Sequence, residues 1–492
     1  MTSEERFSRS RNGCLQCRKK HYKCDEKRPL CSFCSNRGLD CQYPSGLKWV
    51  RQTRPILSRH RPRNNRHGDS GELPRSSASL LLADLFRSDE EKLAWEYSAS
   101  KMLTLNELDV RLVSSNIPAL DGPDNPYRQL SFTALSSPVL LETIVCIATE
   151  HMLNFGLVDV STAARHQTRM LRTIGQNLQL IESGDTCGTT AIVTANNPDH
   201  EALFAAVILQ GVIVAQSADG VLEPHVRCAA FLMEVLNLFR QVPHNVLGRT
   251  TVQRFAMVDV MLAISRQRRP FSPRDFVLHM PDAETWDNTE PSFHKMTGCP
   301  QPLMCFLVRI SHLACDVDER SERCAPINDL LSQAHTLEND LRAWGSCYSG
   351  QVPEEGIRAP LDILTECFYW TAHLLLARRV FQDHTRSPRV QHLTRTCFEL
   401  MDQLSTGVGP DSSLPQPFYL AAREAITLED RAWVRQKHES MTNYYREQQR
   451  NLAMQLTQRI WEIEDEQLKS GNILDSEKLI KRLDRESCLF IF

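Results

Sequence analysis

Six cysteines near the N-terminus are spaced like metal ligands. They form two halves with the same C-x2-C-x6-C pattern, and the second half follows the first by 17 residues. The polar start of the chain has no apolar run typical of a secretory signal, so we expect an intracellular, reducing environment. Thiols grouped in this way then indicate a metal site rather than disulfides. The six candidate ligands are Cys14, Cys17, Cys24, Cys31, Cys34 and Cys41.

The number of thiols predicts two zinc ions that share ligands. Zinc prefers four ligands in a tetrahedron, and a single ion would leave two thiolates over. Two four-coordinate ions need more ligand positions than six sulfurs offer, so two sulfurs must each bind both ions. Because the pattern is duplicated, the first cysteine of each half is the natural bridge, which selects Cys14 and Cys31.

This cysteine array resembles the fungal Zn(2)-C6 binuclear zinc-cluster domain of transcription factors. In that family the first cysteine of each half bridges the two metals, as the spacing here already suggests. Residues 27–31 (KRPLC) are similar to the proline-containing loop that joins the two halves of the family's domain. The resemblance implies a small module with two short helices that binds double-stranded DNA.

A basic stretch in the first half is the candidate DNA-contacting surface. Lysine and arginine side chains on one short helix suit phosphates and guanine edges in the major groove. The corresponding stretch of the second half has only Arg37, balanced by Asp40. An alternative is that the basic residues form a solvated face that offsets the negative charge of a two-zinc, six-thiolate core. The predicted DNA contacts are Arg18, Lys19, Lys20, His21 and Lys23.

His21 departs from the pattern of the resembled family. That family often has a lysine at this position, and the lysine commonly reads a CGG triplet. Histidine can donate to a base or a phosphate, but it is shorter and mostly neutral at cytoplasmic pH. We therefore expect a CGG-like triplet to be read near Lys20 and His21. The cluster's six thiolates already complete both tetrahedra, so His21 is not expected to bind zinc.

The charge of the chain is divided between a basic head and an acidic body. Residues 1–67 contain 17 Lys and Arg against 5 Asp and Glu, although the whole chain has a net charge of −3. A basic head of this kind favours a polyanionic partner such as nucleic acid. Residues 44–78 combine prolines with arginines and show no helical period, which predicts a flexible linker. The prolines interrupt any heptad repeat that could form a dimerising coiled coil, so any dimer should form through the body.

The apolar pattern of the body predicts helices throughout. Ser137 and Pro138 form a helix start, with a capping hydroxyl and a proline in the first turn. Residues 202–215 are apolar all round, long enough for one buried helix but too short for the ~20 residues that span a bilayer. Helical spacing recurs over 361–381 and 452–463, and strand-like alternation is scarce. The predicted fold class is a small binuclear zinc-cluster module plus a large all-α domain.

Two stretches of the body are similar to the fungal-specific transcription factor domain of the second type. Residues 125–128 (NPYR), which lead into 135–138 (LSSP), are similar to its start. Residues 414–419 (LPQPFY), followed by 429–433 (EDRAW), are similar to its C-terminal portion. The resemblance implies a regulatory helical domain with no established catalytic residues.

The body lacks the common catalytic signatures. It has no Walker loop, dinucleotide glycine fingerprint, H-E-x-x-H or G-x-S-x-G motif. Residues 461–466 (WEIEDE) are either an activation segment or an ordinary amphipathic helix. The best metal-like group has no standard spacing, and a buried helix with small soft side chains explains it better. That group consists of Cys305, His312, Cys315, Asp316 and Cys324. We expect the chain not to be an enzyme.

These features predict five segments along the chain. They are a disordered N-terminus (1–13), the zinc module (14–43), a basic flexible linker (44–78), the all-α body (79–470) and a C-terminal tail (471–492). Within the linker, 59–63 (RHRPR) either assists nuclear import, touches the DNA backbone or is simply solvated.

The resemblance implies a nuclear, sequence-specific regulator of RNA polymerase II transcription that controls a secondary-metabolite or catabolic pathway. Its expected partners are double-stranded DNA and the transcription machinery or co-regulators, and no membrane. Two alternatives stay open on the residues alone. One is a zinc-dependent protein-interaction scaffold, and the other is an enzyme with an N-terminal zinc adaptor.

Overall fold

The structure, a computed structural model, separates the chain into two compact units, Met1–Pro74 and Arg75–Phe492. The predicted N-terminal segment 1–13 and linker 44–78 lie outside the described residues. The structure describes 14–41 except for 21, 23, 26, 28, 29 and 40, then 91, 94, 133–183, 198–217, 221–240, 246–274, 293–349, 359–470, 481–483 and 485.

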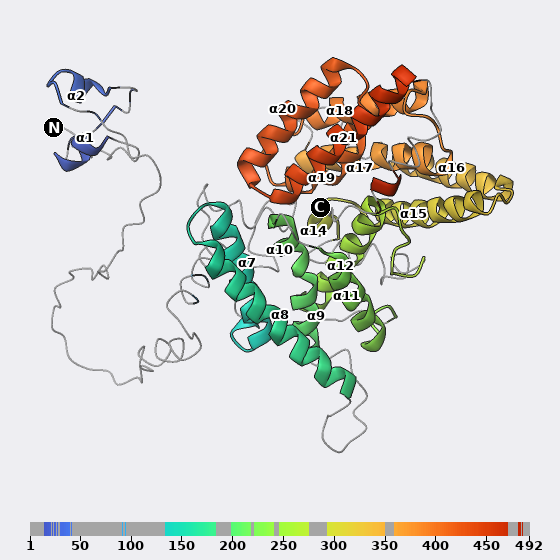
Figure 1. Cartoon of the computed structure of the whole chain (residues 1–492), viewed down its shortest axis with the longest axis horizontal. Coiled ribbons are helices and arrows are strands. Elements are labelled where there is room, and N and C mark those ends of the chain that lie inside the picture. Colours follow the sequence, from blue (N-terminus) through green and yellow to red (C-terminus); the bar gives the residue numbers. More distant parts are fainter. Residues whose placement is uncertain are drawn as a thin grey trace, which may run out of the picture. The chain divides into compact units, whose positions relative to one another are not determined.

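The N-terminal unit contains two short helices, one in each cysteine half. Helix α1 spans Leu15–Lys19 and α2 spans Ser32–Ser35. Both begin directly after the first cysteine of their half. The second unit is built from helices joined by turns in its described part, and no strand occurs among the described residues. The predicted fold class, a small cysteine-cluster module plus a large all-α domain, is confirmed (Figure 1).

The first part of the body packs around α9. Helix α7 lies along α8, and α9 contacts α7, α11 and α12. The helices of this part are α7 (Pro138–Asn154), α8 (Val160–Ser183), α9 (Pro198–Ile208), α10 (Gln210–Gln216), α11 (Glu223–Val235), α12 (Val246–Ser265) and α14 (Phe293–Thr297).

The second part of the body packs around α17, which contacts α15, α18 and α19. Helix α12 packs against both α9 and α15, so a single apolar core continues through both parts. The elements here are α15 (Gln301–Glu322), α16 (Asn328–Ser349), α17 (Pro360–Leu375), a π-helical turn η1 (Leu376–Val380), α18 (Pro388–Asp402), a 3-10 turn η2 (Pro410–Ser413), α19 (Pro415–Ala422), α20 (Leu428–Tyr445) and α21 (Gln448–Ser470).

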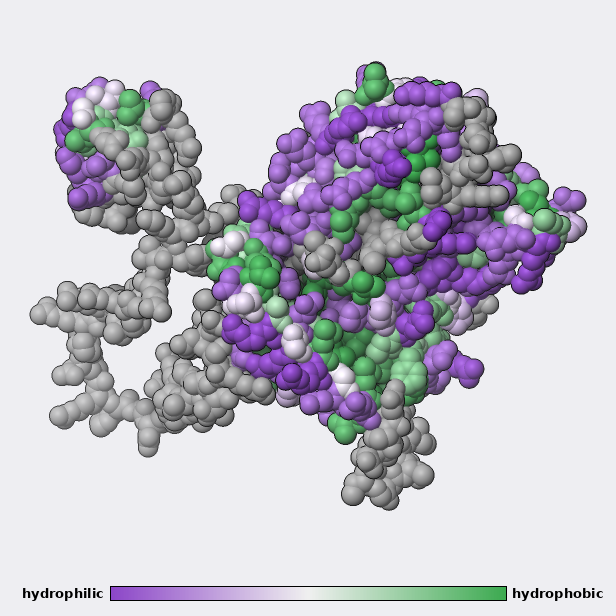
Figure 2. Space-filling model, in the orientation of Figure 1, coloured by the Kyte–Doolittle hydropathy of each residue, from purple (hydrophilic) through white to green (hydrophobic). Residues whose placement is uncertain are grey.

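The visible surface of the body is mostly hydrophilic. Hydrophilic residues dominate the face of the body seen in Figure 2, and apolar residues appear there in smaller patches. No helix among the described residues is long and apolar enough to cross a membrane.

The predicted helix over 202–215 is wrong in one respect, because the segment forms two helices. The helix is interrupted at Leu209, a turn residue between α9 and α10 whose backbone angles stay in the right-handed helical region. The side-chain amide of Gln210 donates to the carbonyl of Ala206 at 3.0 Å and to the sulfur of Met170 at 3.2 Å. In a continuous helix that carbonyl would accept the Gln210 backbone N–H. The side chain takes the place of the backbone donor, and the residues on both sides remain buried.

The prediction that the Ser137 hydroxyl caps a helix is also wrong. Ser137 is the N-cap of α7 and Pro138 is its first residue, but the Ser137 side chain makes no capping hydrogen bond. Its backbone carbonyl accepts the N–H of Leu141 at 2.9 Å. The fixed φ of proline and this first backbone bond are sufficient to start the helix.

Candidate zinc centre and DNA-contacting helix

The six N-terminal cysteines meet in one cluster of sulfur atoms. Two groups of four Sγ atoms, each group contained within 4.8 Å, share Cys14 and Cys31. Cys17 and Cys24 complete one group, and the other two cysteines of the second half complete the other. The duplicated sequence pattern thus becomes two adjoining four-sulfur sites joined by a shared pair.

The sulfur spacing fits tetrahedral zinc. A Zn–S bond of ~2.3 Å places neighbouring thiolates of a tetrahedron roughly 3.8 Å apart. The Sγ atoms of Cys14 and Cys31 are 3.7 Å apart, those of Cys14 and Cys34 are 3.5 Å apart, and those of Cys17 and Cys31 are 3.6 Å apart. Five of the six cysteines are buried and Cys41 is half-buried, so the ligand atoms are shielded from water.

Backbone N–H groups approach the cysteine sulfurs in the same pattern in both halves. The N–H of Cys17 points at the sulfur of Cys14, and the N–H of Cys34 points at the sulfur of Cys31, both at 3.4 Å. The N–H of the first cysteine of each half approaches the sulfur of the last one, at 3.5 Å and 3.3 Å. Such N–H donors favour the charged thiolate, which is the form that binds a metal.

An aspartate ties the end of the first half to the start of the second. The Asp25 carboxylate accepts hydrogen bonds from the backbone N–H of Ser32 at 3.1 Å and from its hydroxyl at 2.5 Å. The bond from the Ser32 hydroxyl lowers the pKa of Asp25 below its ordinary value. Because Asp25 follows Cys24 and Ser32 follows Cys31, this contact fixes two candidate ligands relative to one another.

A small aromatic stack also joins the halves, and sequence reasoning missed it. The rings of Tyr22 and Phe33 stack with their centroids 4.5 Å apart. The guanidinium of Arg37 lies 4.5 Å from the centre of the Phe33 ring and 5.5 Å from that of Tyr22. The available signal was one aromatic residue beside the cysteines of each half. The single cation between the last two cysteines is thus held over aromatic faces.

The described part of the predicted DNA-contacting stretch is exposed. Lys19 ends α1 and Lys20 continues its last turn, with the Lys20 N–H donating to the Gln16 carbonyl at 3.0 Å. Both lysine side chains face solvent. The backbone of Arg18 lies in α1, but its side chain is outside what the structure describes. His21 and Lys23 lie outside the described residues altogether.

The metal-like group considered in the body does not form a candidate metal site among the described residues. Among the described residues, the two groups able to hold a metal are those of the cysteine cluster. Cys305 and Cys315 are buried on α15, and burial raises the pKa of Cys305 to about 12. Cys324 lies beyond the end of that helix and is exposed. The interpretation of this group as ordinary residues of a buried helix agrees with the structure.

The segment 461–466 belongs to the packed helix α21. Trp461 is buried, and its indole N–H donates to the carbonyl of Ala422 at 2.9 Å. Ile463 is buried as well. Of the two sequence alternatives, the described contacts match the amphipathic helix.

Comparison with known families covers both units. Residues 12–49 match the fungal Zn(2)-Cys(6) binuclear cluster domain. Residues 111–490, more than half of the chain, match the fungal specific transcription factor domain. The chain belongs to this family of fungal transcription factors. The prediction of two zinc ions in the N-terminal module is confirmed by the family of that module and by the cysteine cluster. The expectation of a transcription factor rather than an enzyme is likewise confirmed by the families.

Curated relatives of this zinc-cluster chain share short stretches with it. Sterol uptake control protein 2 of Candida albicans is 30% identical over 130 residues, which cover 26% of this chain and 16% of the relative. Thiamine biosynthesis regulatory protein of Saccharomyces cerevisiae is 38% identical over 52 residues, covering 11% and 12%. Transcriptional regulatory protein pro1 of Neurospora crassa is 46% identical over 41 residues, covering 8% and 6%. The chain therefore spans less than a fifth of the length of each of them, and no solved structure matches it.

Proposed function

We propose that this chain is a nuclear, sequence-specific DNA-binding regulator of transcription by RNA polymerase II. The observation that carries the proposal is the cysteine cluster, with two four-sulfur groups sharing Cys14 and Cys31, joined to the exposed basic end of α1. A metal-fixed helix that presents lysines to solvent suits the phosphates and base edges of the major groove. The two matched families support the same function.

In this proposal the six clustered cysteines hold both zinc ions. The ions supply the positive charge that keeps the buried thiolates ionised, and they cross-link the two halves. The protein's own contribution is to position α1: backbone N–H groups orient the sulfurs, and Asp25 holds the start of α2. Lys19 and Lys20 then project from one end of a short rigid element.

We assign base reading to Lys20 and His21, and phosphate contacts to Arg18, Lys19 and Lys23. Lys20 is exposed at the end of α1, and His21 follows it directly in the chain. A cation that bonds guanine O6 and N7 discriminates between bases, whereas a cation on a phosphate strengthens binding to every sequence. The expected target is a CGG-like triplet.

Replacing Lys20 or His21 with alanine should change the sequence that the protein selects. Each loss should cost roughly 1–3 kcal/mol at one base position, because one set of hydrogen bonds to a base edge disappears. The measurement is selection of bound sites from random DNA by the full chain, for wild type, Lys20→Ala and His21→Ala.

Lys19→Ala is the matched control, because it removes the same charge one residue earlier. It should weaken binding to all sequences alike and lower the slope of log K against log salt by about one unit. If Lys20→Ala and His21→Ala kept the wild-type consensus and lost only affinity, the assignment of base reading would be wrong. Weak DNA association that does not respond to salt would instead favour the protein-interaction scaffold.

The body is proposed to be the regulatory part of the molecule. We divide the chain into the zinc module at 14–43, a basic linker at 44–78 and the body at 79–470, with tails outside these limits. The body would contact the transcription machinery or co-regulators, and the genes controlled would belong to a secondary-metabolite or catabolic pathway. Support comes from the match of 111–490 to the fungal specific transcription factor domain.

The N-terminal fragment 1–78 should be monomeric and should bind a single half-site. The prolines between 44 and 78 leave no heptad for a coiled coil, so any dimer has to form through the helical body. Sedimentation of the zinc-loaded fragment beside the full chain is the measurement. A stable dimer of the fragment would contradict this expectation.

A further inference from the structure

A cavity of about 140 Å³ lies in the second unit, Arg75–Phe492, and all of its lining residues belong to that unit. Its apolar wall comes from four helices, with Ile264 on α12, Leu374 and Leu375 at the end of α17, Leu420 on α19 and Ile460 on α21. The rest of its wall is polar, with Gln267 and Gln382 beside a set of charged side chains. The cations that line it are Arg378, Arg379, Arg423 and Lys481, and the acids are Glu424 and Glu464.

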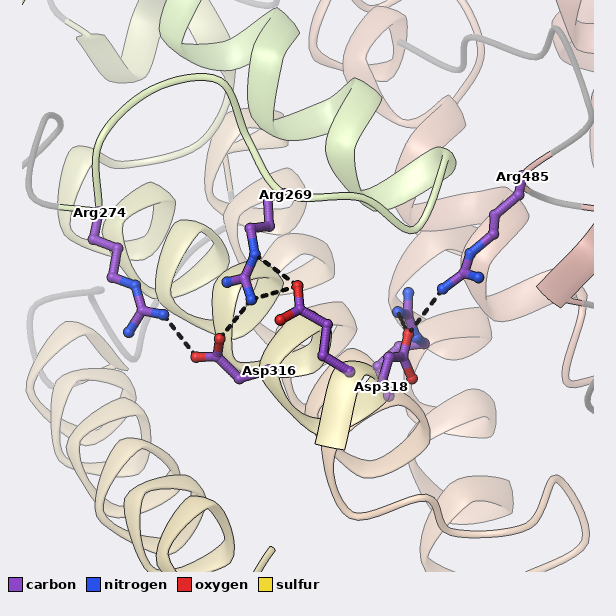
Figure 3. A network of polar contacts seen from close by, with 7 residues as sticks. Arg269, Arg274, Asp316, Asp318 and Arg485 are labelled. Carbon is purple, nitrogen blue, oxygen red and sulfur yellow. Dashed lines mark hydrogen bonds and ion pairs between the residues drawn. The ribbon is translucent and has the colours of Figure 1, made fainter. Parts of the chain in front are cut away.

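One side of the cavity has more positive than negative charge. The buried carboxylate of Asp318 on α15 accepts a bond from Arg379 at 2.9 Å and one from Lys481 at 2.6 Å. The guanidinium of Arg485 approaches the same carboxylate at 3.7 Å, as Figure 3 shows. Three cations therefore share one carboxylate that is only 4% exposed. Arg485 also reaches Glu322 at 3.5 Å, near the surface.

The acids on the other side do not cancel this excess. Glu424 is already engaged, since it pairs with Arg378 at 2.9 Å and accepts the Thr385 hydroxyl at 2.6 Å. Burial, and after it the charge of Glu424, raises the pKa of Glu464 to about 7. A large fraction of the Glu464 side chain is thus neutral near pH 7.

Several buried arginine N–H groups near the cavity have no hydrogen-bond acceptor in the described part of the chain, and they indicate the kind of ligand that would fit. The buried Nε of Arg379 has no acceptor among the described residues. Gln267 lines this cavity and also an adjoining hollow of about 390 Å³, where the buried Nε atoms of Arg266 and Arg268 have no acceptor among the described residues either. These atoms, and Nη1 of Arg266 with them, are donors on cations. The group that satisfies them must be a hydrogen-bond acceptor, and an anionic acceptor would also offset the positive charge.

We propose that this cavity binds a small organic acid. Its carboxylate would lie between Arg379 and Lys481, and its apolar part against Leu374, Leu420 and Ile460. An apolar cavity of about 150 Å³ accommodates benzene, so the present volume suits a single ring or a short branched chain. A neutral acceptor such as an amide carbonyl would leave the positive charge unbalanced, and a cation would meet like charge. The inference goes beyond DNA recognition and does not depend on it.

Thermal melting of the full-length protein with defined probes tests the proposal. Benzoate and 4-methylpentanoate, each at about 10 mM, should raise the melting temperature by a few degrees through preferential binding to the folded state. Benzamide and 4-methylpentanamide have the same shape without the charge, and they should have little effect. Equal shifts with acids and amides, or no shift with either acid, would overturn the proposal.

Two substitutions locate the effect. Leu420→Trp should fill the cavity and abolish the shift caused by both acids. Lys481→Gln should reduce the shift severalfold while Arg379 and Arg485 still neutralise Asp318, and it keeps the test valid if the tryptophan variant does not fold. Arg459→Gln removes an exposed cation of α21 that pairs only locally with Glu462, and it should respond like wild type. Wild-type shifts in both Leu420→Trp and Lys481→Gln would place the binding elsewhere and refute the site.

The pH dependence of binding is a second readout. Glu464 faces Arg378 and Arg386, Glu424 and the Thr385 hydroxyl, and it lines the cavity with Arg423 and Lys481. Protonation of Glu464 removes a negative charge, so benzoate should bind severalfold more tightly at about pH 6 than at about pH 8, where it is ionised throughout. Glu464→Gln should bind equally well at both values. Equal wild-type affinity at both values would contradict a ligand beside Glu464.

Discussion

Replacing Cys14 with alanine should destroy both zinc sites at once, whereas Cys24→Ala should affect mainly one. Cys14 belongs to both four-sulfur groups, and Cys24 belongs to only one of them. Losing a shared sulfur leaves each ion with three cysteine ligands from this cluster. Zinc binding contributes on the order of 10 kcal/mol to folding in such small modules, so Cys14→Ala or chelation should unfold 14–41 and abolish DNA binding.

Native mass spectrometry of the full chain measures this directly. Wild type should carry two zinc ions, Cys24→Ala should retain one, and Cys14→Ala should retain none. Cys324→Ala is the control, because Cys324 is an exposed cysteine of the body outside the cluster. It should keep both ions. A single zinc ion in the intact wild-type protein would contradict the shared-ligand arrangement.

The second large effect is expected in the body, where Asp259→Ala should lower the free energy of unfolding by about 3–5 kcal/mol. Asp259 lies on α12 and is fully buried. Its carboxylate accepts the backbone N–H of Phe271 at 2.9 Å, the N–H of Ser272 at 2.8 Å and the Ser272 hydroxyl at 2.7 Å. Arg268 lies 3.5 Å away. Alanine would leave these donors and a half-buried cation without their acceptor.

Denaturant unfolding of the full chain, followed by circular dichroism of the helical body, checks this prediction. The control is Asp340→Ala, since Asp340 forms a half-exposed pair with Arg309 at 3.5 Å. Ion pairs in solvent contribute little, so this variant should unfold almost like wild type. If Asp259→Ala and Asp340→Ala were equally mild, the carboxylate of Asp259 would not hold the 268–272 segment.

The local chemistry of the zinc module could be predicted from the sequence. Six thiols within a short stretch can satisfy two tetrahedral ions only by sharing two sulfurs, and the repeat selects Cys14 and Cys31 for that role. The all-α body was predictable for a similar reason. Apolar residues at helical spacing have to be buried on one face, and that pattern is visible over 137–152 and 361–381.

Contacts between residues far apart in the chain were decided only by the tertiary structure. At the break between α9 and α10, the Gln210 amide donates to the sulfur of Met170, 40 residues earlier, and helix propensity does not encode that contact. The charge cluster at Asp318 combines Arg379, 61 residues later, with Lys481, 163 residues later. Spacing determines which side chains share a turn or a metal ion, because those distances are set by covalent geometry. Which distant helices enclose a cavity, and which charges remain there unmatched, follows from how a whole core packs.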